Sequence, residues 1–208
     1  MGRYIGPLTK VSRRLGTFVG GNLKAFKKRN FPPGQHGRTQ GRKKLSDYAI
    51  RLQEKQKLRY LYGGLREKQF KKYFDEAVRL AGVKGGNTGD ILLQLLERRL
   101  DNVVYRMGFA KTRLQARQLV RHGHFLVNGR KVNIPSFQVK PGDIIELKEK
   151  SKQSPLFKEN LESRDIKSIP SWLEVDKENF RGKVLEIPEK VELEIPVNVQ
   201  LIIEYYSA

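Results

Sequence analysis

The stretch RLDNVVYRMGFAKTRLQARQLVRHGHFLVNGRKVNIPSFQVKPGDII, residues 99–145 of a 208-residue chain, decides the fold. Apolar residues recur at helical spacing from Leu100 to Met107, and Gly108 ends that pattern. A T-x-x-Q capping box at 112–115 then begins a second helix. The stretch therefore predicts two short helices in succession.

A small antiparallel sheet is predicted to follow these helices. Residues 125–127 are apolar and lead into Asn128-Gly129, the strongest two-residue signal for a hairpin. The return strand comes next, and a second turn at 141–143 introduces another strand over 144–147. A helical pair followed by a local sheet indicates an α+β fold.

Cations gather on this predicted module. Arg113, Arg117 and Arg121 recur every four residues on one face of the second helix. Lys111 lies at the entrance of that helix, and Lys131 lies at the hairpin tip. A row of arginines alone is usually a solvated face, but the row, the lysine and the basic tip together favour a surface for RNA phosphates.

The charge of the whole chain points to a polyanionic partner. Lys and Arg number 42 against 22 Asp and Glu, which gives a net charge of +20. Residues 1–50 hold 12 cations and one acid, whereas residues 151–208 hold 8 cations and 11 acids. Nucleic acid is the first candidate for the partner, and an anionic membrane surface is the second.

Residues 1–44 are basic and show little periodicity. Glycines and Pro32-Pro33 leave too few apolar residues for a core, which predicts an extended arm that orders on nucleic acid. A disordered solubilising tail is the competing interpretation. Phe18 and Phe26 argue against it, because aromatic side chains are typical of packing or base stacking.

Further helices are predicted between the arm and the module. Ser46 can cap a helix over 46–62, and an apolar stripe predicts another over 70–81, ended by Gly82. The loop after it lacks the Gly-Lys-Ser/Thr ending of a phosphate loop. We expect Thr88 to cap the helix that follows that loop.

The last part of the chain combines a polar linker with an apolar near-repeat. Residues 149–170 are polar, with one helix predicted after Ser154-Pro155. The near-duplicates EIPEKVEL and EIPVNVQL, over 186–201, are interpreted as extended segments, in which proline limits strand pairing. Alternating apolar residues over 199–203 predict a final strand.

The sequence lacks most signatures of an enzyme or a metal protein. Without cysteine it has no disulfide, no Cys-ligated metal site and no Cys nucleophile. His122 and His124 would need further ligands to hold a metal, so histidines in a loop or facing RNA are the preferred interpretation. The R-L-D sequence ending at Asp101 is similar to the motif around the catalytic aspartate of pseudouridine synthases. We favour a structural Asp101 that caps a helix or forms an ion pair.

Residues 99–145 resemble the RNA-binding module named after the fourth protein of the small ribosomal subunit, which also occurs in pseudouridine synthases and tyrosyl-tRNA synthetases. The flanks resemble that ribosomal protein family itself. They include RYIGPLTKVSRRLG at 3–16, PPGQHGR at 32–38, the segments at 45–74 and 87–109, PSWLEVD at 170–176, and the ending IIEYYSA. The resemblance covers essentially the whole chain.

The fold that the resemblance implies is α+β. It has a mainly helical first domain with a basic N-terminal arm, and a small RNA-binding domain in which a helical pair packs on an antiparallel sheet. We expect an extended arm at 1–44, a helical domain at 45–97 joined by the C-terminal segment 170–208, and the RNA-binding module at 98–160.

The function that the resemblance implies is that of a structural constituent of the small ribosomal subunit. The family binds 16S rRNA at a helix junction in the 5′ domain, nucleates assembly of the subunit body and contributes to translational accuracy. The implied partners are ribosomal proteins five and twelve of the small subunit and mRNA near the entry channel, with no membrane and no small-molecule substrate. An RNA-modifying enzyme similar to pseudouridine synthases, using the same module, is the alternative.

The expected location is the cytoplasm, in the small ribosomal subunit. No apolar run is long enough to span a bilayer, and the N-terminus lacks the apolar core of a signal peptide. An organellar ribosome is the alternative. Many bacterial members of the family hold zinc through N-terminal cysteines, which this chain lacks, so no metal and no cofactor are expected.

The candidate RNA-binding residues are cations of both domains and one histidine. In the module they are Lys111, Arg113, Arg117, Arg121 and Lys131. Before the module they are Arg3, Arg13, Arg14, His36, Arg38, Arg51, Lys55, Arg59 and Arg66. No catalytic residue and no metal ligand is expected.

Overall fold

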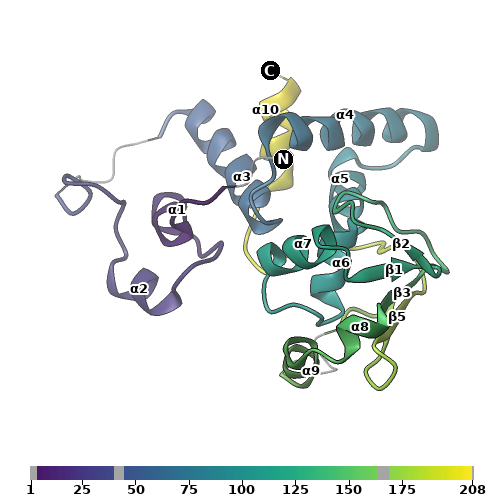
Figure 1. The fold of residues 1–208 in the computed structure, drawn as a ribbon. Helices are drawn as coiled ribbons and strands as arrows, with labels where there is room; N and C mark the ends of the chain where they lie inside the picture. Colours follow the sequence, from purple (N-terminus) through teal and green to yellow (C-terminus); the bar gives the residue numbers. More distant parts are fainter. Residues whose placement is uncertain (1–3, 40–44, 164–168, 208) are drawn as a thin grey trace. The chain divides into compact units, whose positions relative to one another are not determined.

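The structure, a computed structural model, describes residues 4–39, 45–163 and 169–207. The chain forms two compact units (Figure 1), which comprise Met1–Gly89 with Glu192–Ala208, and Asp90–Val191. This division differs from the expected domain boundaries, which placed the whole segment 170–208 with the first helical domain. The structure places 170–191 in the second unit, because two strands of that segment complete its sheet.

The basic N-terminal segment differs from the extended arm that its composition predicted. It contains two short helices, α1 (Leu8–Leu15) and α2 (Leu23–Lys28). The buried Ser12 hydroxyl donates a hydrogen bond to the Gly20 carbonyl oxygen at 2.8 Å and accepts one from the Val19 amide at 3.2 Å. These bonds tie the connection between the helices back to α1.

We predict that Ser12→Ala loosens this segment. The substitution leaves the Val19 amide and the Gly20 carbonyl without their hydroxyl partner, at a cost of about 1–3 kcal/mol. Amide hydrogen exchange at Val19 should therefore accelerate about fivefold or more. Unchanged protection of that amide would mean that the Ser12 hydroxyl does not hold the segment together.

Two longer helices of the first unit are α3 (Asp47–Leu61) and α4 (Glu67–Lys84). The predicted cap of α3 is confirmed, because the Ser46 hydroxyl oxygen accepts a hydrogen bond from the Ala49 amide at 3.3 Å. The predicted end of α4 at Gly82 is wrong, since the helix continues to Lys84. A single glycine inside a helix costs only about 1 kcal/mol relative to alanine, which the buried stripe of α4 offsets.

The segment predicted as a final strand is instead a helix, α10 (Val199–Ser207). The Asn198 side-chain oxygen caps it by accepting a hydrogen bond from the Gln200 amide at 3.0 Å. Ile202 is fully buried, and α10 packs against α3 (Figure 1). The apolar pattern at 199–203 fits a helix as well as a strand, and the asparagine cap favours the helix.

Three helices lie at the start of the second unit: α5 (Thr88–Glu97), α6 (Leu100–Arg106) and α7 (Arg113–Arg121). The last two are the predicted helical pair. Thr88 is the first residue of α5 rather than its cap. The side-chain oxygen of Asn87 makes the capping bond by accepting from the Gly89 amide at 2.8 Å.

The sheet of the second unit is antiparallel throughout, in the order β2-β1-β3-β5-β4. Its strands are β1 (Phe125–Val127), β2 (Arg130–Lys131), β3 (Ile144–Leu147), β4 (Leu173–Asp176) and β5 (Arg181–Val184). The predicted hairpin is confirmed, because Asn128 (φ 49°) and Gly129 (φ 74°) both have the left-handed conformation that its tight turn needs. These features confirm the α+β class.

Strands β4 and β5 join the sheet through residues far apart in the sequence. Ile144 of β3 pairs with Lys183 of β5, and Glu174 of β4 pairs with the same lysine. At the neighbouring Gly182, a Cβ atom would lie 2.6 Å from the sulfur of Met107, the residue after α6, and 3.1 Å from the Glu174 carbonyl oxygen. Glycine therefore lets the Met107 side chain pack directly on β5.

Two short helices connect β3 to β4. The helix predicted after Ser154-Pro155 is confirmed as α9 (Pro155–Glu162). A preceding turn of helix, α8 (Glu149–Lys152), was not predicted. The buried Asn160 side chain of α9 donates a hydrogen bond to the Phe109 carbonyl oxygen at 3.0 Å, which anchors α9 to the loop before α7.

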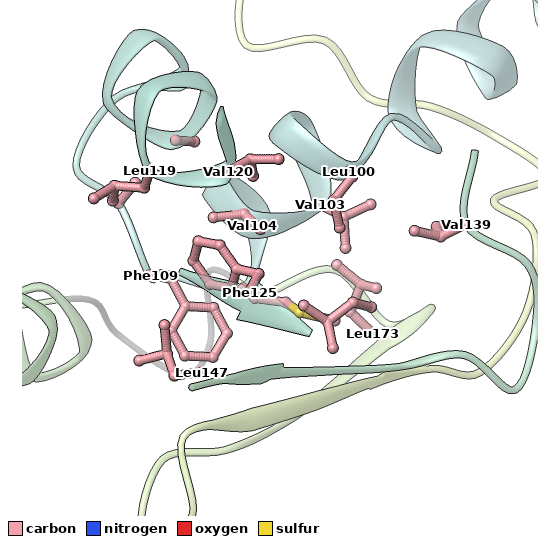
Figure 2. Packing of buried hydrophobic residues seen from close by; sticks show 14 of the residues in the cluster. Leu100, Val103, Val104, Phe109, Leu119, Val120, Phe125, Val139, Leu147 and Leu173 are labelled. Carbon is pink, nitrogen blue, oxygen red and sulfur yellow. The ribbon is translucent and has the colours of Figure 1, made fainter. Parts of the chain in front are cut away.

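The core of the second unit lies between the helical pair and the sheet. Figure 2 shows side chains of α6, α7 and the strands meeting in one cluster. The rings of Phe109 and Phe125 meet edge to face with centroids 5.6 Å apart, and both side chains are fully buried. The core thereby fixes the orientation of α7, whose other face carries the row of arginines.

None of the helices in the described parts of the chain is long and apolar enough to cross a membrane.

Candidate nucleic-acid interface

The arginine row on α7 passes from the interior to the surface. Arg113 is 8% exposed, the side chain of Arg117 is 16% exposed, and Arg121 is exposed. The sequence predicted the spacing of the row but not this gradient. The last turn of α7 therefore offers the accessible end of the row.

The capping box that begins α7 is confirmed, with one difference in its reciprocal bond. The Thr112 hydroxyl oxygen accepts from the Gln115 amide at 3.1 Å. The Gln115 side-chain oxygen accepts from the Lys111 amide at 2.7 Å rather than from the cap residue itself. The ammonium group of Lys111 pairs with the exposed carboxylate of Glu159, so this lysine already has an anionic partner.

Asp101 links α6 to the arginine row. Its carboxylate accepts two hydrogen bonds from the guanidinium group of Arg99, at 3.0 and 2.8 Å, and one from Nε of Arg117 at 2.8 Å. Arg99 is 1% exposed and Asp101 is 3% exposed. The prediction of a structural, ion-paired Asp101 is confirmed.

Glu97 organises a second buried group of polar side chains. Its carboxylate accepts hydrogen bonds from the guanidinium group of Arg106 at 2.8 and 3.0 Å and from the Asn102 amide at 2.8 Å. The Asn102 side-chain oxygen in turn accepts from Nε of Arg113 at 2.8 Å. Glu97 and Asn102 were not predicted as part of this site, because nothing in the local sequence marks an acid or an amide as the partner of an arginine elsewhere in the chain.

The hairpin that follows α7 exposes Arg130 and Lys131, and the turn before β3 exposes Lys140. The tip is braced by Asn128, whose side-chain amide donates to Asp143 at 2.9 Å and whose side-chain oxygen accepts from the Ile144 amide at 2.9 Å. Arg130 and Lys140 were not among the predicted binding residues. The exposed, rigid turn around Asn128-Gly129 is the signal that would have added Arg130.

In the first unit, three predicted binding residues of α3 lie among protein groups. Lys55 is 2% exposed and donates to Glu67 at 2.8 Å, while Arg59 lies 4.0 Å from the same carboxylate. Burial opposes ionisation of Glu67, but the bonds from Lys55 and Tyr206 outweigh it and hold its pKa below the ordinary value. Arg51 bonds to Glu204 of α10 at 3.1 Å. Through these ion pairs the three cations of α3 stabilise its packing against α4 and α10.

The remaining predicted residues of the first unit are mostly exposed. Arg13 is half-buried and contacts the loop after α2. Its guanidinium group donates a hydrogen bond to the Phe31 carbonyl oxygen at 3.0 Å and lies 4.8 Å from the centre of the Phe31 ring. The exposed ones are Arg14, His36, Arg38 and Arg66, and Arg3 lies outside the described residues. The sequence analysis did not select the exposed cations around α2, which are Lys24, Lys27, Lys28 and Arg29.

Of the two histidines after α7, His124 is partly buried and His122 is exposed. The centres of the His122 and His124 rings are 6.3 Å apart, and Nδ1 of His124 lies 2.9 Å from the Ser151 hydroxyl. In the described ranges, no three side chains of His, Asp or Glu come together in a group that could hold a metal ion. Burial, and then the charges of His122 and Lys148, lower the pKa of His124.

We predict that His124 makes the unfolding free energy depend on pH. Because its pKa is lower in the folded chain, the unfolded chain takes up the proton more readily, and stability falls as pH drops below about 6.5. Urea unfolding at pH 7.5 and 5.5 should show a smaller loss for His124→Gln than for the parent chain. The exposed His36→Gln serves as the control. An equal loss in the parent and in His124→Gln would contradict the prediction.

Two sequence families match consecutive parts of the chain. The family described as "Ribosomal protein S4/S9 N-terminal domain" matches residues 3–97, and the "S4 domain" matches residues 98–145. The chain belongs to the ribosomal protein S4 family. This membership makes it a structural ribosomal protein and not an enzyme.

Relatives in the S4 family are similar along their whole length. The protein named "Small ribosomal subunit protein uS4" from Persephonella marina is 85% identical over 208 residues, with all of both chains covered. The relatives of the same name from Sulfurihydrogenibium sp. and Aquifex aeolicus are 77% and 65% identical, with all of this chain and 100% and 99% of the relatives covered. Such full-length similarity does not support the pseudouridine synthase alternative.

Proposed function

We propose that the chain binds 16S rRNA in the small ribosomal subunit through the exposed cations of its S4 domain, assisted by the basic first unit. The observation that carries this proposal is the exposure of three cations: Arg121 at the end of α7, and Arg130 and Lys131 in β2 of the hairpin that follows it. Guanidinium and ammonium groups there can bind phosphates and release condensed counterions.

The mode of recognition that we propose is reading of junction shape. An A-form helix hides its base edges in a deep, narrow groove, so a rigid protein surface reads its backbone. The braced hairpin and the core behind α7 supply such a rigid surface. Membership of the S4 family, rather than this geometry, is the reason for assigning the binding site to a helix junction of the 5′ domain, where binding would nucleate the subunit body.

The finer partners of the proposed function follow from family membership. They are ribosomal proteins five and twelve of the small subunit and mRNA near the entry channel, with a contribution to translational accuracy. The expected location is the cytoplasm. Residues 151–208 hold 11 acids against 8 cations. A segment with this excess of acids is less suited to contact RNA phosphates, which supports contacts with protein partners.

Hydroxyl-radical protection of full-length 16S rRNA by the purified chain tests the proposal. The mapping is done near physiological salt, with large-subunit rRNA as competitor. We expect a compact footprint at one junction of the 5′ domain that survives the competitor. Diffuse or competitor-sensitive protection would show that the charge gives only non-specific affinity and would overturn the proposal.

A further inference from the structure

We propose that Asp101 is a positioning residue, which holds the guanidinium group of Arg117 in the orientation that an rRNA phosphate needs. The inference rests on the proposed function and assigns a role to an acid that cannot itself contact phosphate. Asp101 is 3% exposed and belongs to α6, whereas Arg117 belongs to α7. Their contact is a charged hydrogen bond of 2.8 Å between Oδ2 and Nε.

The position of the Asp101 carboxylate is itself fixed. Arg99 donates to both of its oxygens, from Nε at 3.0 Å and from Nη2 at 2.8 Å, in the two-pronged geometry that suits a carboxylate. Arg99 is 1% exposed, so it is enclosed by the protein and has little freedom to move. A fixed carboxylate that accepts from Nε of Arg117 sets the direction of that N–H bond and so restricts the orientation of the guanidinium group.

The charges of the three side chains leave attraction for a phosphate. The Arg99–Asp101 pair is neutral in sum, so adding Arg117 leaves the trio with one positive charge. Within this trio, the Arg99–Asp101 pair therefore orients Arg117 through a hydrogen bond and leaves a net positive charge on the three side chains together. The side chain of Arg117 keeps 16% of its surface exposed, between the buried Arg113 and the exposed Arg121.

Positioning of this kind lowers the cost of binding. A free arginine side chain loses rotamer freedom when it binds a phosphate, and one that is already oriented loses less. Removing the orienting acid should therefore weaken binding, even though removing a negative charge from a basic protein generally strengthens its attraction for RNA. Loss of the orienting contact lowers the affinity for RNA and loss of the negative charge raises it, so the direction of the measured change in affinity shows which effect dominates.

A double-mutant cycle on 16S rRNA affinity tests the inference. Asp101→Asn should bind about three- to tenfold more weakly than the parent chain, and its plot of log affinity against log salt should be less steep by about 0.7–0.9. When Arg117→Ala is already present, Asp101→Asn should no longer weaken binding, and only the slight gain from the lost negative charge should remain. Equal weakening by Asp101→Asn in both backgrounds, or tighter binding by Asp101→Asn in the parent background, would overturn the inference.

Controls separate positioning from charge and from folding. Glu149→Gln removes one acid with an 87% exposed side chain from the same unit and should leave affinity unchanged or slightly raised. Fluorescence of Trp172, the sole tryptophan and part of the core, reports whether each variant is folded. Should Asp101→Asn fail to fold, Arg117→Lys decides. It keeps the charge but lacks Nε, so the inference requires it to lose affinity, and unchanged affinity would overturn it.

The cycle also distinguishes this inference from the proposed function. If the parent chain bound large-subunit rRNA as tightly as 16S rRNA, the proposed function would be refuted. Absence of coupling between Asp101 and Arg117, measured on the affinity that the parent chain has for 16S rRNA, would refute the inference alone.

Discussion

Glu97→Ala should lower the free energy of unfolding of the second unit by about 3–5 kcal/mol. Glu97 is 1% exposed and accepts hydrogen bonds from Arg106 and Asn102. Its removal leaves the guanidinium group of Arg106, which is 9% exposed, without this carboxylate. The cost exceeds the worth of the ion pair itself, because the arginine stays charged in a place that excludes water.

Urea unfolding followed by Trp172 fluorescence measures this effect. The matched control is Glu149→Ala, which breaks an ion pair with Lys152 in which the Glu149 side chain is 87% exposed. Exposed pairs contribute about 0–1 kcal/mol, so the control should change stability little. Equal shifts for Glu97→Ala and Glu149→Ala would show that burial of the Glu97 carboxylate is energetically unimportant.

The combined substitution Arg121→Ala and Lys131→Ala should weaken 16S rRNA binding about tenfold to a hundredfold at moderate salt. Both residues are exposed, one at the end of α7 and one in β2, so the fold should survive. If each contacts one phosphate, the salt dependence of log affinity should fall by roughly 0.7–0.9 for each residue.

Filter binding or fluorescence anisotropy across a salt series measures both quantities. Lys150→Ala with Lys158→Ala removes the same charge from exposed positions on α8 and α9 and serves as the control. A loss of the same size in the control would mean that only net charge matters. An unchanged slope in the first variant would remove the end of α7 and the hairpin from the interface.

Local signals in the sequence predicted the parts of the fold that neighbouring residues determine. The Asn128-Gly129 turn, the capping box at Thr112 and the cap at Ser46 each act within a few residues, and all are found in the structure. The C-terminal helix was predicted as a strand because a short apolar run fits either period, and packing against α3 decides between them.

Strands β4 and β5 could not be predicted from local pattern. Each has four residues, and the pair that they form joins the sheet because β5 pairs with β3, more than thirty residues earlier in the chain. Such pairing is a property of the folded unit and not of the segment. The domain boundary near residue 170 was misplaced for the same reason, since the strands draw the segment into the second unit.

The sequence predicted which residue types form the candidate site, but it did not predict which of them are buried. The spacing of Arg113, Arg117 and Arg121 predicted a row on one face of α7. Which end of the row is accessible depends on Asp101 and Asn102, which belong to α6. A cation's partner on a neighbouring helix is set by helix packing, and a single sequence carries no direct signal for it.

The two-sided pairing of β3 has a consequence for synthesis of the chain. β1 pairs with one edge of β3 and β5 with the other, and the ribosome makes β1 and β3 well before β5. A nascent chain that has not yet reached Val184 therefore presents β3 as an open edge, which can template pairing with another chain. A fragment that ends soon after β3 (Ile144–Leu147) keeps that open edge permanently, whereas a fragment extended through β5 closes it.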